Sequence, residues 1–158
     1  MSTPNNEIAR KIIKDNIYMT IATADKSGEP WISPVVFGYD EDYNLYWMSD
    51  KNSKHSKLIS QNNKVAIVIF DSKAPEGTGD GVYTVGRAAE LLERELSKAT
   101  KIHADRFGKE PTPIGKFLGE SPMRYYKFTP DIFWKLQDPV LVKGQYVDYR
   151  VEVKPTEP

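Results

Sequence analysis

The sequence contains no cysteine and only two histidines, His55 and His103. A chain without thiols cannot form disulfide bonds, a zinc–thiolate cluster or a cysteine nucleophile. Two imidazoles are also too few for most transition-metal sites built by protein alone, so we expect no bound metal. Redox chemistry in this protein would therefore require an organic cofactor.

Long hydrophobic runs and an excess of charge of one sign are also missing. No apolar run approaches the roughly 18 residues that a membrane helix needs, and the N-terminus lacks the apolar core of a signal peptide. We therefore expect a cytoplasmic protein without a membrane partner. The 22 basic side chains equal the 22 acidic ones, so no overall field attracts nucleic acid, and none is expected as a partner.

The hydrophobic pattern divides the chain into a few helices and many short strands. Thr3 and Pro4 are typical of a helix start, which places the first helix within residues 1–16. Apolar residues in 93–107 recur every three or four positions, as on one face of a helix. We expect helices over 4–15, 52–61 and 93–107, and strands over 17–24, 31–39, 43–49, 65–71, 82–92, 123–128, 132–136 and 146–153.

Strands at hairpin spacing with few helices indicate a mainly β fold. We expect a closed or partly closed antiparallel barrel of six to seven strands with peripheral helices. No internal repeat or linker divides the chain, so residues 1–158 are expected to form a single domain. The continuous apolar strand 65–71 is expected to be buried on both faces, and the tail 154–158 to be frayed.

The segment 46–57 has the strongest signature of a binding site. A strand ends there and a helix begins, and Ser49, Ser53, Lys54 and His55 follow one another closely. Free backbone N–H groups at a helix start, hydroxyl groups and a lysine are the donors that bind a phosphate monoester. The same pattern also fits a solvated Lys/Ser helix face with Asn52 as a simple cap.

Pro34 interrupts an otherwise regular strand pattern. Proline cannot donate a ladder hydrogen bond, so the strand is expected to be bulged or to lie at a sheet edge at this point. Backbone groups freed there would suit a planar polar ring. An edge strand that merely tolerates proline explains the pattern equally well.

Other candidates are weaker. The glycine-rich segment 77–81 lacks the lysine of a phosphate loop and leads into a strand, so we interpret it as a hairpin tip. His103 lies on the apolar face of its helix and is expected to pack there. No Gly-x-Ser-x-Gly motif supports a serine hydrolase.

Taken in order, these segments resemble the pyridoxamine 5'-phosphate oxidase-like family of split barrels that bind flavin mononucleotide (FMN). The resemblance spans residues 7–153 and rests on several short motifs rather than on one. They are Met19-Thr20-Ile21-Ala22-Thr23, Gly28-Glu29-Pro30, Ser33-Pro34-Val35-Val36-Phe37, Leu45-Tyr46-Trp47-Met48-Ser49, Ser53-Lys54-His55-Ser56, Asn62-Asn63-Lys64-Val65-Ala66, Gly81-Val82-Tyr83-Thr84-Val85-Gly86-Arg87-Ala88, the stretch 124–134 and Arg150-Val151-Glu152-Val153.

The resemblance implies an FMN site and a homodimer with the flavin near the interface. The flavin phosphate would face Lys54 and His55, with Ser49 and Ser53 beside them and Met48 adjoining. The isoalloxazine ring would be lined by Ser33, Pro34, Val35, Val36 and Phe37, and Trp134 would flank the cofactor.

Several positions depart from the family pattern. Ser33 stands where many members have an arginine, and His55 where lysine is common. Arg150 follows Trp134 by sixteen residues, which is farther than the usual pairing, and the Arg-Leu-His substrate motif is absent. We therefore expect an FMN-dependent oxidoreductase of unassigned substrate that is not a true pyridoxine 5'-phosphate oxidase.

Two alternatives belong to other functional classes. The same phosphate site would serve a non-enzymatic protein that stores, senses or carries a flavin or another cofactor. A small barrel with several lysines near aromatic residues would also suit single-stranded nucleic acid, although the zero net charge argues against it.

Overall fold

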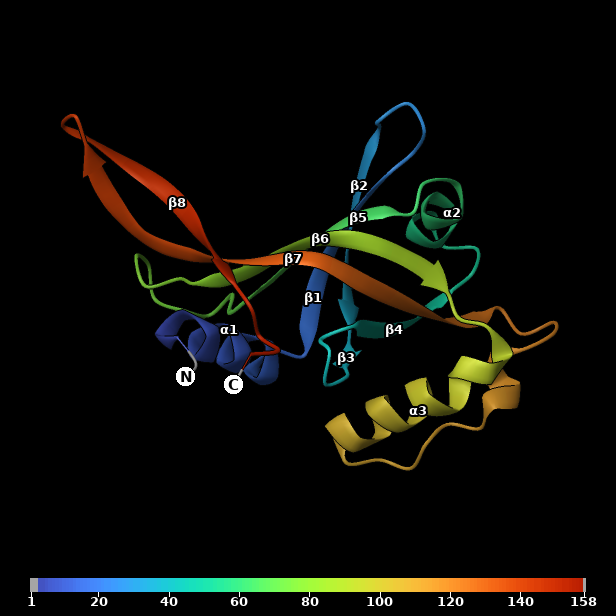
Figure 1. Ribbon diagram of the computed structural model, residues 1–158. Helices are drawn as coiled ribbons and strands as arrows, with labels where there is room; N and C mark the ends of the chain where they lie inside the picture. Colours follow the sequence, from blue (N-terminus) through green and yellow to red (C-terminus); the bar gives the residue numbers. More distant parts are fainter. Residues whose placement is uncertain (1–2, 158) are drawn as a thin grey trace.

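The computed structural model describes residues 3–157 as one antiparallel sheet with helices packed against it (Figure 1). The strands are β1 (Tyr18–Ala24), β2 (Pro30–Val36), β3 (Gly38–Tyr39), β4 (Leu45–Asp50), β5 (Lys64–Phe70), β6 (Gly81–Glu90), β7 (Met123–Val142) and β8 (Gln145–Val153). The helices are α1 (Pro4–Asp15), α2 (Lys54–Gln61), α3 (Glu93–Phe107) and the 3-10 turn η1 (Ile114–Phe117). The expected mainly β class with peripheral helices is confirmed.

The strand order explains why the barrel is split. The sheet runs β2-β1-β5-β6-β7-β4-β3, with β8 added beside β7. It therefore ends at β2 on one side and at the short β3 on the other, and these two strands do not pair. The core enclosed by the sheet contains Ile21, Phe37, Trp47, Ile69 and Phe128, each with at most 1% of its surface exposed.

The N-terminal helix forms as its sequence predicts. The Thr3 side chain accepts a hydrogen bond from the Asn6 backbone N–H at 3.3 Å, and Pro4 occupies the first turn. Ala9 and Ile13 are fully buried against the barrel core. The helix therefore covers one part of the core. No helix within residues 3–157 has the length and apolar character needed to cross a membrane.

Two strand assignments differ from the sequence prediction. Phe37 interrupts the expected strand 31–39, so β2 and β3 are separate. The expected strands 123–128 and 132–136 are one strand, β7, because the register shifts between Val85 and Gly86 of β6 and leaves Asp131 without a partner. This β-bulge accommodates Pro130 within the ladder. The division and the joining offset each other in the strand count, and the sheet has eight strands, against the six to seven expected for the barrel.

Strand β5 is not buried on both faces, contrary to the prediction. Val65, Ile67 and Ile69 point into the core, whereas Ala66 and Phe70 are exposed and Val68 is half-buried. Apolar residues thus occupy the outer face of this strand as well as the inner one. An uninterrupted apolar run can mean that both faces of a strand are buried in the core, or that one face is an exposed apolar surface. The sequence alone does not tell the two apart.

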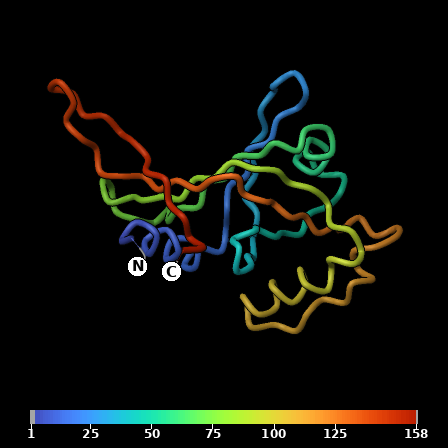
Figure 2. The backbone as a smooth tube through the Cα atoms, in the orientation of Figure 1, coloured from blue at the N-terminus to red at the C-terminus, as the bar shows by residue number. Residues whose placement is uncertain are grey.

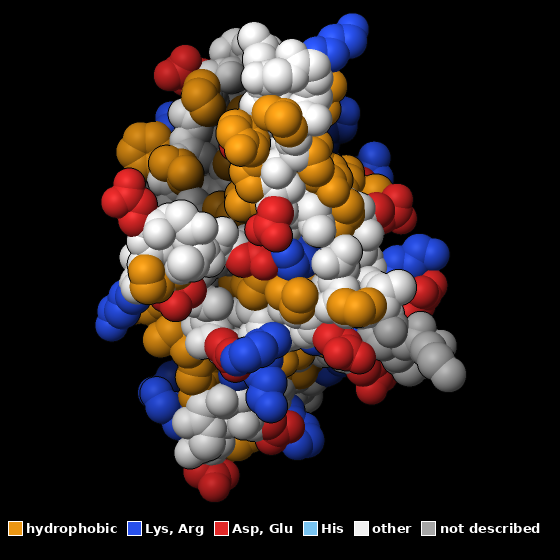
Figure 3. Space-filling view, turned by 90° about the vertical axis from the view of Figure 1, so that its left-hand side faces the viewer, with side chains coloured by type: hydrophobic (Ala, Val, Ile, Leu, Met, Phe, Trp, Pro, Cys, Tyr) orange, Lys and Arg blue, Asp and Glu red, His pale blue; other side chains and the backbone are white. Residues whose placement is uncertain are grey.

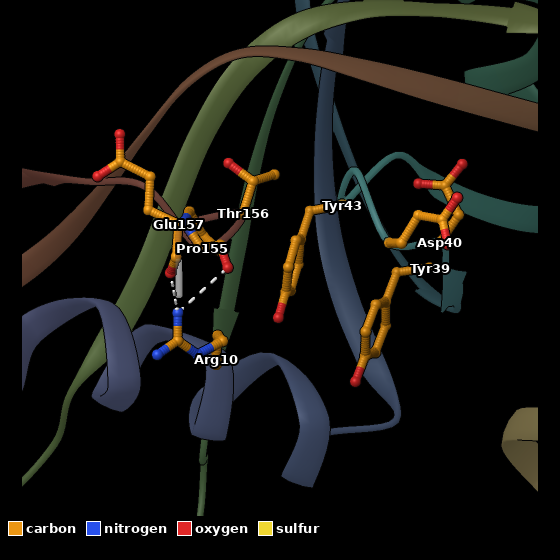
Figure 4. Close-up of a pocket in the computed structure, with 8 residues that line it drawn as sticks. Arg10, Tyr39, Asp40, Tyr43, Pro155, Thr156 and Glu157 are labelled. Atoms are coloured by element: carbon orange, nitrogen blue, oxygen red, sulfur yellow. Dashed lines mark hydrogen bonds between the residues drawn. The ribbon is translucent and has the colours of Figure 1, made fainter. Parts of the chain in front are cut away.

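Residues 154–157 of the tail 154–158, which was predicted to be frayed, pack against α1, and residue 158 lies outside the described residues. The Lys154 N–H donates to Asn6 Oδ1 at 2.9 Å, and Pro155 is buried. Arg10 donates through Nη1 to the carbonyl oxygens of Pro155 and Glu157, at 3.3 and 2.5 Å. These contacts fasten the end of the described chain to α1, as Figure 4 shows.

Candidate functional site

The predicted phosphate-binding residues meet where β4 ends and α2 begins. His55 Nε2 lies 2.8 Å from Ser49 Oγ and 3.2 Å from Ser53 Oγ. Ser53 caps α2 by accepting from the Ser56 N–H at 3.3 Å, and its hydroxyl donates to Ser56 Oγ at 2.9 Å. We call Ser49, Ser53 and His55 the hydroxyl–imidazole cluster, because both hydroxyl groups lie within hydrogen-bonding reach of His55 Nε2.

Positive charge surrounds this cluster. Lys54 and Lys57 are exposed on α2, and Lys51 is half-buried just before the helix. Among residues 3–157 none of these three lysines forms an ion pair, and α2 has no acidic residue in its first turn. The partial positive charge of the helix start adds to that of the lysines. The combination favours a small anion over a neutral ligand.

His55 is half-buried, and burial lowers its pKa below the ordinary value. The imidazole is therefore largely neutral at pH 7 and has one donor and one acceptor nitrogen. With Ser49 and Ser53 beside it, Nε2 can accept from a hydroxyl or donate to it. An anion bound nearby would favour the protonated ring, because its negative charge offsets the cost of burial.

The predicted ring-binding strand contributes less than expected through side chains. Val35 and Phe37 point into the core and are 8% and 0% exposed. Ser33 is half-buried and its hydroxyl accepts from Trp31 Nε1 at 3.1 Å. Pro34 is exposed and pairs with Thr20 in regular register, so β2 is an edge strand without a bulge at this position. A planar ring placed along β2 would therefore contact the side chains of Pro34 and Val36 and the backbone of the strand.

Met48 and Trp134 do not join the cluster within one chain. The Met48 side chain lies on the opposite face of β4 from Ser49, where it lines a pocket with Phe117 and Met123. Trp134 lies on β7 ten residues beyond Arg124, the partner of Ser49, which corresponds to about 30 Å of extended strand. Trp134 instead pairs with Tyr83 of β6 and Glu152 of β8.

Asp40 has a structural role that was not predicted from the sequence. Its side chain accepts hydrogen bonds from the Asn44 side chain and backbone, from the Tyr46 hydroxyl at 2.9 Å and from Lys98 at 3.0 Å. Burial alone would raise the Asp40 pKa, but these hydrogen bonds outweigh it and hold the pKa below its ordinary value. An Asp at the start of a turn was the available signal, since Asp commonly bonds backbone groups there.

A hollow of about 590 Å³ lies between α1, the turn after β3 and the chain end (Figure 4). Tyr39 and Tyr43 stack in it with ring centroids 5.3 Å apart, and the Arg106 guanidinium covers the Tyr39 ring at 4.7 Å. Tyr43 has φ +57°, a conformation that its bulky side chain rarely adopts. Because the Tyr43 N–H donates to Asp40 O at 3.0 Å, the Asp40 turn fixes this strained residue.

Comparisons with solved structures place the fold among known split barrels. The Agrobacterium tumefaciens protein Atu2129, of unknown function, is 18% identical with a TM-score of 0.69; 82% of this chain is covered, but only 55% of that one. HutZ, the heme storage protein of Vibrio cholerae, is 12% identical with a TM-score of 0.69, covering 82% of this chain and 92% of HutZ. A protein described as an F420 reductase is 16% identical with a TM-score of 0.56, covering 78% of this chain and 94% of that one.

At these identities the structural likeness establishes the fold. A sequence comparison with curated proteins found no match. The family model described as pyridoxamine 5'-phosphate oxidase matches residues 6–124, which include β1 to α3 and the whole hydroxyl–imidazole cluster. The chain therefore belongs to the pyridoxamine 5'-phosphate oxidase family of split-barrel proteins, as the ordered motifs of its sequence indicated.

Proposed function

We propose that this protein binds FMN, with the flavin phosphate at the hydroxyl–imidazole cluster and Lys54, and that it acts as an oxidoreductase. The observation that carries the proposal is that the hydroxyl oxygens of Ser49 and Ser53 both lie within 3.2 Å of His55 Nε2 at the start of α2. Two hydroxyls, an imidazole, a helix start and a lysine form a donor set that fits a phosphate monoester.

FMN would supply the hydride or electron transfer, and the chain would bind and orient it. Lys54 would pair with the phosphate, and Ser49 would donate a hydrogen bond to it. The Ser53 hydroxyl would donate a second one by turning away from Ser56 Oγ. Pro34 and Val36, on the outward side of β2, would face the ring together with the strand backbone. This assignment replaces the expectation that all five side chains of 33–37 line the flavin, because Val35 and Phe37 are part of the core.

The proposal includes a homodimer. The outer face of the sheet exposes several large apolar side chains, with Tyr18 56%, Ile32 67%, Phe70 46% and Val85 40% exposed. Apolar surface of this kind on a small protein usually marks an interface. We expect a second copy packed on this outer face to bring its Trp134 toward the flavin. Light scattering at working concentration tests the assembly, and a monomer with flavin bound would contradict it.

Flavin titration tests the assigned phosphate site. We expect Lys54→Ala to weaken FMN binding at least about tenfold, because a charge-assisted hydrogen bond contributes on the order of 1.5–3 kcal/mol. Lys73→Ala is the matched control, since Lys73 is exposed in the loop after β5 and its side chain forms no ion pair among the described residues. Equal FMN affinity of Lys54→Ala and the unmodified protein would refute the assignment.

Cofactor identity and turnover are tested separately. The absorption spectrum of freshly purified protein distinguishes a flavin from a haem, and mass spectrometry of the released ligand identifies it. Reduced nicotinamide cofactors with an electron acceptor then test catalysis. Bound FMN without turnover of any donor would favour the alternative function, a non-enzymatic flavin-binding protein.

We further propose that the protein does not oxidise pyridoxine 5'-phosphate efficiently. This substrate has its own phosphate, so a second group of fixed cations is required beside the flavin site. Among the candidate cations, Arg124 pairs with Glu90 at 2.9 Å, and Arg150 lies over the Tyr83 ring at 3.7 Å. Arg87 is exposed and forms no ion pair among the described residues, but it stands outside any Arg-Leu-His motif. Formation of pyridoxal phosphate by FMN-loaded protein at about 1 per second or faster would contradict this proposal.

A further inference from the structure

The last two strands extend beyond the rest of the sheet. Strand β7 pairs with β6 only as far as Lys135, and from Gln137 outward it pairs with β8 alone. Lys143 and Gly144 close the hairpin with φ of +48° and +80°, which is the backbone of a tight two-residue turn. We call residues 137–149 the arm; Figures 1 and 2 show it projecting away from the remaining elements.

The arm exposes more apolar surface than a hairpin in water normally does. On the side that continues from the buried Phe133 and Val153, Val140, Val142, Val147 and Tyr149 are 41%, 48%, 43% and 38% exposed. On the other side, Leu141 is 63% and Tyr146 80% exposed. Figure 3 views the molecule from the side on which the arm projects. Hydrophobic side chains gather in the upper part of this view.

A bare two-stranded hairpin is marginally stable, and its open edges promote association. The inner side of the arm keeps the apolar alternation of a core-facing strand, but the arm extends past the chain's own core. Its sequence therefore fits a surface that another molecule covers.

Two features indicate that this molecule is a second copy of the chain. First, the arm is continuous with the outer sheet face proposed as the dimer interface, through Trp134, Tyr83 and Arg150 at its base. Second, the charges are complementary. Asp138 and Asp148 against Lys143 give the arm a net charge of −1, whereas segment 51–57 has three lysines and no acidic residue.

The acidic groups of the arm and the lysines beside α2 also lack partners within the described chain. Neither Asp138 nor Asp148 forms an ion pair there, and Lys51 and Lys57 form none either. The arm and α2 lie at opposite ends of the molecule (Figure 1), so these groups cannot meet within one chain. Two copies related by a twofold axis would make both contacts reciprocally.

We propose that the arm of each copy docks on α2 of the other and forms a wall of the partner's cofactor site, an inference that rests on the proposed homodimer. The acidic groups of the arm face Lys51 and Lys57, and its apolar residues cover the edge strand β2, where Trp31 and Ile32 are 46% and 67% exposed. Lys54 stays available for the phosphate. The arm thereby limits the size of the substrate that reaches the flavin.

The absence of native cysteine makes a direct test possible. The double variant Tyr146→Cys/Lys57→Cys is expected to form, on mild oxidation, a covalent species of twice the chain mass on a non-reducing gel. Each single variant serves as a control for random pairing. The matched variant Tyr146→Cys/Ser97→Cys, with its second cysteine exposed on α3, is expected to remain at the mass of one chain.

A shortened arm provides the second measurement. Replacing residues 138–148 by Asn-Gly preserves the Gln137–Tyr149 pair and is expected to raise the dissociation constant of the dimer at least about tenfold in sedimentation experiments. A dimer that resists both cross-linking and arm shortening would overturn the docking of the arm and leave the homodimer intact. A monomeric unmodified protein would overturn both.

Discussion

The pH dependence of FMN binding tests the role of His55 most sharply. Burial keeps the pKa of the free side chain below its ordinary value of 6.5. A phosphate within reach of Nε2 raises that pKa, because the anion stabilises the imidazolium. The complex therefore binds a proton more tightly than the free protein does, and FMN affinity must fall as pH rises from the free pKa through the raised pKa of the complex.

The expected size follows from the hydrogen bond itself. A neutral hydrogen bond contributes about 0.5–1.5 kcal/mol and a charge-assisted one about 1.5–3 kcal/mol, so the protonated ring gains about 1.4 kcal/mol, or about tenfold in affinity. The second ionisation of the FMN phosphate acts in the opposite direction, because rising pH adds negative charge near Lys54. The ratio of unmodified protein to His55→Gln cancels this contribution, since both proteins bind the same phosphate.

The assay is fluorescence titration of FMN between about pH 5 and pH 8, with riboflavin as the ligand that lacks the phosphate. We expect the affinity ratio of the unmodified protein to His55→Gln to fall about tenfold across this range for FMN and to stay constant for riboflavin. A constant ratio for FMN would show that His55 does not meet the phosphate as a cation. An equal fall for riboflavin would place the effect elsewhere in the protein.

Two further predictions concern stability. Gly86→Ala should destabilise the fold by about 3 kcal/mol or more, because a Cβ there would lie 2.1 Å from the Thr129 carbonyl oxygen, whereas Gly79→Ala, in open space, should change the free energy of unfolding by less than about 1 kcal/mol. Asp40→Ala should cost about 2–4 kcal/mol, since it leaves the buried Tyr46 hydroxyl and the Asn44 N–H without their acceptor. Chemical denaturation measures the free energy of unfolding of each variant. Equal stability of Gly86→Ala and Gly79→Ala would contradict the first prediction. An Asp40→Ala protein as stable as the unmodified one would contradict the second.

The elements predicted best from the sequence are those that local residues determine. Helix α1 begins at Thr3 and Pro4 because cap and proline act within one turn, and α3 ends at Gly108 because that residue adopts φ +61°. The hydroxyl–imidazole cluster was equally accessible, since Ser49, Ser53 and His55 span only seven positions across one strand–helix junction. Short sequence separation therefore made both the helix ends and the cluster predictable.

The errors have a different origin. The joining of two expected strands into β7 depends on a bulge opposite Gly86, far away in the sequence, and the fastening of the tail depends on Asn6 and Arg10 at the other end of the chain. The side chains of Val35 and Phe37 point into the core rather than outward, because their apolar character serves the core as well as it would serve a ligand. Alternation along a strand predicts which residues share a face, but not which face meets the ligand.

The position of Trp134 is not explained by the fold of a single chain. The family resemblance places it beside the cofactor, whereas the fold holds it ten residues along β7 from the strand partner of Ser49. The proposed homodimer reconciles the two statements, because the tryptophan would then serve the site of the other copy. A second copy would also cover the outward apolar residues of β5 and the apolar residues of the arm. Both sets follow the pattern of a buried strand, but within one chain they are exposed. The proposed homodimer would account for three separate mismatches between the sequence pattern and the fold of one chain, and a monomeric protein would leave all three without explanation.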